Sequence, residues 1–151
     1  MACFKDFGKI KIVSENQASS LDLAVIATGN EIYPSMMLSV SIMDEEFTGA
    51  YDKVWVSAED LAKFVADLLL CEQVRKGQAS LSSLSPDDLK LTVEQSDGWG
   101  HFVLRYTLGR ISYSSRISLS KSLSGGFDLD SGSFKEIVED FADLLRTIAP
   151  P

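Results

Sequence analysis

The sequence predicts an α+β fold in which a mostly antiparallel, curved β-sheet of about seven to nine strands carries two amphipathic helices on one face. Two long segments have the apolar spacing of a helix, many short segments alternate apolar with polar residues, and turn residues separate them. Strands with one apolar face and helices with one apolar stripe bury each other most simply in two layers. We therefore expect a two-layer sandwich.

Residues 57–75 predict the first helix. Its apolar stripe consists of Leu61, Phe64, Val65, Leu68 and Val74. Ser57 is the expected N-cap, with Asp60 three residues later in a near match to the capping box. Cys71 lies beside the stripe, where a small apolar side chain fits. A left-handed C-cap is expected at Lys76-Gly77.

Residues 133–148 repeat this pattern and predict the second helix. Its stripe consists of Phe134, Ile137, Val138, Phe141, Leu144, Leu145 and Ile148. Ser133 and Glu136 spell a capping box. Displacing the second half of the chain lays Phe134 over Leu61, and each half ends in a short strand, a cap and a helix. We therefore expect a ββββα-type pseudo-repeat.

Alternation predicts the strands of the first half. They are expected at residues 9–13, 21–28, 36–43 and 47–56. Residues 44–46 form a turn between the last two, and Gly49 marks an expected bulge.

The strands of the second half centre on a hairpin. Residues 89–94 and 102–108 alternate on either side of Asp97-Gly98, which suits a tight turn. Before them, residues 79–84 form a short strand or a loop. After them, Gly109-Arg110 is expected to turn the chain into one long or bent strand over residues 111–123. Gly125-Gly126 should end that strand before a last short one at residues 127–129.

The length of 151 residues predicts one domain spanning residues 1–151. No apolar run is long enough to cross a bilayer and no secretory signal is recognisable, so we expect a cytoplasmic protein. Cys3 and Cys71 are too few and too far apart for a disulfide or zinc framework, and we expect reduced thiols.

The net charge of −8 disfavours nucleic acid and anionic membranes as partners. It would speed the approach of a basic protein, although an acidic surface also serves solubility alone.

No grouping of residues predicts catalysis. His101 is the only histidine, and no nucleophile motif accompanies it. One histidine and two distant cysteines cannot close a metal site, and the glycines match no nucleotide fingerprint. Asp128 and Asp130 read as a solvated strand end rather than a catalytic carboxylate pair. We therefore expect no catalytic, metal-binding or cofactor-binding residue, and no enzyme.

Three surface features are candidate protein-binding elements. The first is a row of short polar side chains on strands, with two arginines: Ser39, Ser41, Thr92, Thr107, Ser112, Ser114, Ser118, Ser120, Arg105 and Arg116. The second is the acidic tip Asp44-Glu45-Glu46. The third is the aromatic pair Trp99, beside Gly100, and Tyr33, before Pro34. For the first two features, plain solvent exposure is the alternative. For Trp99, the alternative is packing over the end of the hairpin strand.

The layout of the whole chain resembles a known family. The segments FGKIKIV, VWVSAEDLAKFVADLLL, LKLTVEQSDGWGHFVLRYTL and FDLDSGSFKEIVEDFADLL are similar to those of the small immunity proteins that include the one for the wall-associated protein toxin, and to related bacterial immunity-type domains. The resemblance implies a cytosolic antidote that binds and masks the toxic, nuclease end of a polymorphic toxin. It transfers no site residues.

The expected function is therefore that of a non-catalytic immunity protein, a monomer or weak homodimer, whose partner is a basic toxin domain. The alternative is a module that binds a small molecule or peptide on the same sheet surface or in a cavity between sheet and helices.

Overall fold

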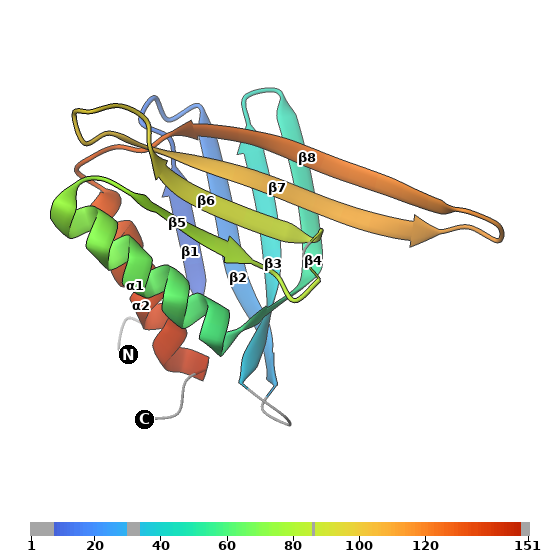
Figure 1. Cartoon of the computed structure of the whole chain (residues 1–151). Helices are drawn as coiled ribbons and strands as arrows, with labels where there is room; N and C mark the ends of the chain where they lie inside the picture. The colour runs from blue at the N-terminus through green and yellow to red at the C-terminus, as the bar shows by residue number, and fades with distance from the viewer. Residues whose placement is uncertain (1–7, 30–33, 86, 149–151) are drawn as a thin grey trace, which may run out of the picture.

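The computed structural model describes residues 8–29, 34–85 and 87–148, and Figure 1 shows its elements. In chain order these are β1 (Lys9–Val13), β2 (Ser19–Gly29), β3 (Ser35–Asp44), β4 (Phe47–Ser57), α1 (Ala58–Val74), β5 (Gln78–Ser82), β6 (Leu89–Gln95), β7 (Phe102–Tyr113), β8 (Ser118–Asp128) and α2 (Phe134–Ile148). The predicted α+β class is confirmed, and the structural equivalence of the two halves stays a prediction. Cys3 and Tyr33 lie outside the described residues.

The strands form two antiparallel sheets rather than the one sheet predicted. Strands β1 to β4 pair in chain order in the first sheet, and β5 to β8 pair in chain order in the second. The sheets pack face to face, with β4 against β7 and with β3 and β4 against β8. Each strand has one apolar face, and two sheets can bury those faces against each other as well as against helices. Alternation alone does not distinguish these arrangements.

The two helices lie together on one side of the molecule (Figure 1). They pack against each other, α1 also against β5 and α2 against β1, which are the first strands of the two sheets. The rings of Phe64 and Phe141 meet edge to face with centroids 5.0 Å apart. One continuous apolar core joins both sheets and both helices. No helix among the described residues combines the length and apolar character needed to cross a bilayer.

The helix ends confirm one predicted cap and correct two. The Ser57 hydroxyl accepts a hydrogen bond from the Asp60 amide at 3.1 Å, as predicted. The C-cap of α1 is Arg75, with φ of 58°, and not Lys76-Gly77. The Ser133 hydroxyl donates to the carbonyl of Asp130 instead of forming the expected capping box. In the α1 stripe, Val74 is 48% exposed, and Cys71 is buried in its place.

The glycines predicted to turn or break strands lie inside them. Strand β7 runs through Gly109 and β8 runs through Gly125-Gly126. A Cβ at Gly109 would lie 2.5 Å from the carbonyl oxygen of Asp87, and one at Gly126 would lie 2.6 Å from that of Leu104. These glycines therefore permit close backbone approach.

The turn between β7 and β8 lies within residues 111–123, where the sequence predicted one long or bent strand. The Ser114 amide donates to the carbonyl of Ile117 at 2.9 Å. The irregularity expected at Gly49 lies elsewhere, because the β3–β4 register shifts between Leu38 and Val40. Gly49 instead makes room for Leu123, whose Cδ2 would lie 2.9 Å from an added Cβ.

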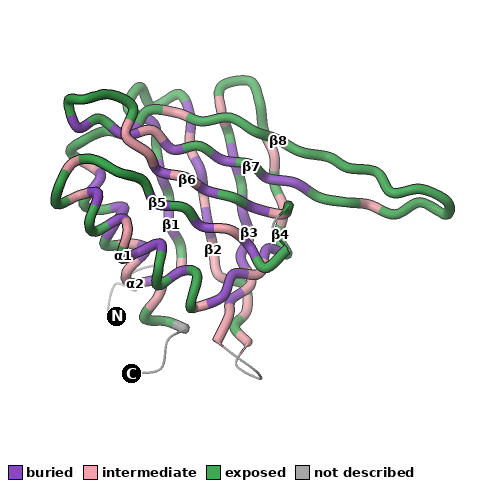
Figure 2. Tube along the Cα trace, in the orientation of Figure 1, coloured by how far each residue is buried: buried purple, intermediate pink, exposed green. Residues whose placement is uncertain are grey.

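The outer part of the β7–β8 hairpin extends beyond the rest of the molecule (Figure 1). We call residues 110–121 the β7–β8 arm. Every residue of the arm except Ser112 is exposed (Figure 2).

Candidate functional site

Carboxylates from three separate segments surround one cavity of about 500 Å³. The cavity is lined by Ser14, Glu15, Asn16, Ser19, Asp44, Glu45, Gly126, Phe127 and Asp128. We call Glu15, Asp44, Glu45 and Asp128 the acidic rim. The lining residues include four carboxylates and no basic side chain. Carboxylates grouped in this way attract cationic side chains and repel anions.

Contacts between the two sheets hold the acidic rim in place. Asp44, at the end of β3, accepts hydrogen bonds from the Ser19 hydroxyl at 2.7 Å and from the Tyr106 hydroxyl of β7 at 2.5 Å. Burial raises the pKa of Tyr106, and the hydrogen bond to the Asp44 carboxylate raises it further. The Glu15 amide donates to the carbonyl of Asp128 at 2.9 Å.

Glu45 and Glu46 form the exposed turn between β3 and β4. Glu45 has φ of 56°, a left-handed conformation that fixes the direction of this turn. Phe47 follows with 65% of its surface exposed. The predicted acidic tip is therefore an exposed turn in which only Asp44 is half-buried and engaged with the second sheet.

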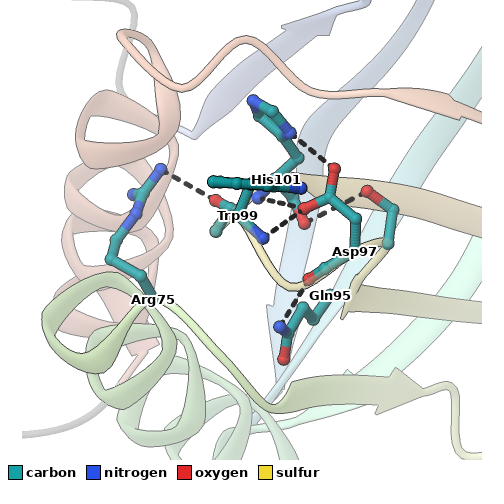
Figure 3. Close-up of polar contacts among 7 residues, drawn as sticks. Arg75, Gln95, Asp97, Trp99 and His101 are labelled. Carbon is teal, nitrogen blue, oxygen red and sulfur yellow. Dashed lines mark hydrogen bonds and ion pairs between the residues drawn. The ribbon is translucent and has the colours of Figure 1, made fainter.

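The only histidine lies in the turn between β6 and β7 (Figure 3). Nδ1 of His101 lies 2.7 Å from Oδ2 of Asp97, and Oδ1 of Asp97 accepts from the Trp99 amide at 2.8 Å. The hydrogen bond to Asp97 raises the pKa of His101, and the same bond is the largest cause of the lowered pKa of Asp97. The pair thus closes the turn with a charge-assisted contact on the surface.

Arg75, at the end of α1, holds this turn in place. The Arg75 guanidinium donates to the carbonyl of Gly100 at 3.1 Å (Figure 3). It also lies over the rings of Phe102 and Phe134. In the described part of the chain, no hydroxyl or thiol is hydrogen-bonded to the imidazole of His101, as attack by a serine or cysteine would require. Trp99, predicted as a binding residue, is 87% exposed here.

The predicted row of polar side chains does not form one surface. Ser39 and Ser41 lie on the outer face of the first sheet, opposite the buried residues of β3. Thr92, Arg105 and Thr107 lie on the outer face of the second sheet, where Arg105 pairs with Glu94. The row is therefore divided between two sheets. In the first, the β2–β3 and β3–β4 registers set Ser41 between Asp22 and Ala50.

The remaining predicted residues lie in or beside the turn of the β7–β8 arm. Ser112 is half-buried, whereas Ser114 and Arg116 are exposed. The arm also exposes four large apolar side chains: Ile111, Tyr113, Ile117 and Leu119. At its base, the Arg110 guanidinium lies 5.5 Å from the ring centroid of Tyr51 in β4.

Two members of the acidic rim were not predicted as binding residues: Glu15 was not singled out, and Asp128 was interpreted as part of a solvated strand end. Glu15 and Asp128 are far apart in the chain and meet only because the end of β1 lies beside the end of β8. Alternation gives no information on such neighbours. The basic character of the arm was readable, because residues 110–121 contain Arg110, Arg116 and Lys121 and no acidic residue.

Within the described residues, no three or more His, Cys, Asp or Glu side chains are placed to hold a metal ion together. Comparison of the sequence with known protein families finds no match, and comparison with functionally described proteins finds none either.

Proposed function

We propose that this chain is a non-catalytic binding protein, a cytoplasmic immunity protein whose acidic rim receives a basic surface of a toxin's nuclease domain. The single observation that carries the proposal is the cavity of about 500 Å³ bounded by four carboxylates and no basic side chain. The resemblance of the chain layout to small immunity proteins supports the choice of partner.

The acidic rim suits rapid capture of a cationic surface. A nuclease binds the phosphate backbone with basic side chains, and a carboxylate-lined cavity has the complementary sign. Such complementarity raises the association rate more than it lowers the dissociation rate. Salt screens the attraction and so weakens the effect. The neighbouring Glu46 and the exposed Phe47 add charge and apolar area beside the cavity.

Preorganisation also supports this role. Asp44 is held by the Ser19 and Tyr106 hydroxyls before any partner arrives. Asp128 is held at its backbone by the Glu15 amide. A rim already in position loses little conformational freedom on binding.

The test is calorimetric titration of the full chain with the toxin nuclease domain that we propose as its partner, to be sought in the neighbouring gene. The triple variant E15Q/E45Q/D128N removes three rim charges, and E72Q/D87N/E139Q removes three charges elsewhere. We expect tight binding of the parent chain and of the second variant, and binding weaker by on the order of a hundredfold for the rim variant. Equal affinities of all three proteins would refute the rim as the binding site.

A second candidate function rests on a different cavity. Residues 103–107 of β7 and 124–128 of β8 line a cavity of about 610 Å³, which is large enough for a small molecule or a peptide side chain. A metabolite bound there would raise the melting temperature of the chain in the absence of any protein partner. A screen of metabolites by thermal shift separates this function from capture of a basic protein.

A further inference from the structure

The β7–β8 arm exposes apolar surface that a two-stranded ribbon cannot bury by itself. Ile111 is 42% exposed, Tyr113 81%, Ile117 61% and Leu119 46%. An isolated hairpin is marginally stable in water, and clustered apolar exposure marks an interaction surface. The arm is the longest such projection in Figures 1 and 2.

The arm continues into the open edge of the second sheet. Strand β8 ends the strand order of that sheet, whereas β5 at the other edge packs against α1. Long open edges recruit further strands unless charge, proline or a covering element blocks them. Between Ser118 and Phe127, β8 has no proline and one charged residue, Lys121.

The hydrogen bonds at the two ends of the hairpin show which residues face this edge. The Leu129 amide donates to Phe102, and the Ser114 amide donates to Ile117. Antiparallel strands alternate between residues that bond to the neighbour and residues that face away. The residues of β8 whose backbone groups face the open edge are therefore Ser118, Ser120, Ser122, Ser124 and Gly126. This free edge ends at Asp128, whose carbonyl accepts from the Glu15 amide.

Charge is divided between the two ends of the same strand. The arm holds Arg110, Arg116 and Lys121 without any acid, which leaves 11 basic against 22 acidic side chains in the rest of the chain. At the opposite end of β8 lies the acidic rim, with Asp128 and Glu15. Two copies placed antiparallel along β8 therefore set the basic end of each against the acidic end of the other.

We propose that the occupant of this edge is a second copy of the chain, paired antiparallel through β8 about a two-fold axis near Ser122. In this register Ser118 lies opposite Gly126 of the second copy, which brings the turn that carries Arg116 beside its Asp128. The β8 edge of each copy is covered by the β8 edge of the other. Because the two copies use the same surface, the assembly closes as a dimer.

The inner side of the arm supports the same register. The β7–β8 pairing puts Arg110 beside Lys121 and Ser112 beside Leu119 on the side that faces the first sheet. Across a paired edge, the same faces of the two sheets are continuous. Lys121 and Leu119 therefore extend over the β3–β4 turn of the second copy, beside Glu45 and the 65% exposed Phe47. The second copy and the proposed toxin partner therefore compete for this surface.

The test is sedimentation velocity of the full chain without any other protein, so its result is independent of the proposed function. We expect the parent chain to sediment as a species of twice its 16.5 kDa mass. This dimer should dissociate as the salt concentration rises. The variant S120P removes an edge amide but no amide that bonds to β7, and S120A is its matched control. The dimer dissociation constant should rise on the order of tenfold or more in S120P and stay unchanged in S120A.

A charge exchange tests the register without proline. Arg116→Asp and Asp128→Arg should each weaken the dimer on the order of tenfold, and the double variant R116D/D128R should restore it. A parent chain that stays monomeric at about 0.1 mM, where even a weak dimer forms, would overturn the proposal. So would a dimer that is insensitive to S120P, or charge variants whose effects do not cancel.

Discussion

The hydroxyl of Tyr106 donates a 2.5 Å hydrogen bond to the carboxylate of Asp44 and so ties the second sheet to the first. Tyr106 is 3% exposed, and Asp44 begins the turn that carries Glu45. The Asp44 carboxylate is a member of the acidic rim, so the same contact that joins the sheets also positions the candidate site.

Removing the Tyr106 hydroxyl should destabilise the protein. Tyr106→Phe leaves the half-buried Asp44 carboxylate with only the Ser19 hydroxyl as a described side-chain donor. A hydrogen bond to a charged group contributes about 1.5–3 kcal/mol, and we expect a loss of that size in the free energy of unfolding by urea. The variant Y51F, which removes a hydroxyl from a partly buried tyrosine on β4, is the control. An unchanged urea midpoint for Y106F would contradict this role.

Gly125 should resist substitution because it makes room for this contact. A Cβ there would lie 2.6 Å from the Tyr106 hydroxyl and 3.0 Å from Asp44. Gly125→Ala should cost about 1–3 kcal/mol of stability through overpacking. In the Y106F background the clashing oxygen is absent. The double variant should therefore lose less stability than the sum of the losses in the two single variants. Gly98→Ala is the control, since its Cβ meets nothing within 4 Å, and full additivity of G125A with Y106F would count against the account.

The two serines predicted as helix caps should differ in their effect on stability. Ser57→Ala removes the acceptor of the Asp60 amide and should cost about 0.5–2 kcal/mol of unfolding free energy. Ser133→Ala removes only a donor to Asp130, so its cost should be clearly smaller. Chemical denaturation of both variants checks this order, and a larger loss for S133A would show that Ser133 is the more important cap.

His101 should titrate above its ordinary pKa of 6.5 because Asp97 stabilises the imidazolium. Its contribution to stability is complete below pH 6.5 and is lost as the pH rises through the folded-state pKa. The lowered pKa of Asp97 gives the opposite pH dependence. The contribution of Asp97 to stability is complete above pH 3.8 and is lost as the pH falls through its folded-state pKa.

An NMR titration of the imidazole protons measures this directly. Asp97→Asn should return the pKa of His101 toward 6.5, whereas Glu15→Gln, at a weaker and secondary source of the shift, should move it less. A parent histidine that titrates at or below 6.5 would show that the hydrogen bond does not persist in solution.

Much of the fold was predictable because local patterns decide it. The stripes of α1 and α2, the Ser57 cap and the β6–β7 hairpin all follow from residues close together in the chain. The turn at residues 114–117 was missed because this segment contains no glycine, proline, asparagine or aspartate, and its two serines do not stand out from the many serines of the flanking strands. The glycines at 109 and 126 gave the opposite error, since their role is to admit a neighbouring carbonyl.

The candidate site was less predictable because it depends on which strands become neighbours. The acidic tip at residues 44–46 was visible in the sequence, but its association with Glu15 and Asp128 depends on contact between the two sheets. For the same reason, Ser39 and Arg105 were predicted to share one polar face, whereas they lie on different sheets. Alternation predicts that a residue faces outward, and only the topology decides which outer surface it joins.

The most direct test is a nuclease assay of the toxin domain that we propose as the partner, with this chain added in stoichiometric amount. We predict that the parent chain and E72Q/D87N/E139Q abolish cleavage, and that E15Q/E45Q/D128N leaves most of it intact. Cleavage at the uninhibited rate in the presence of excess parent chain would contradict the proposed function.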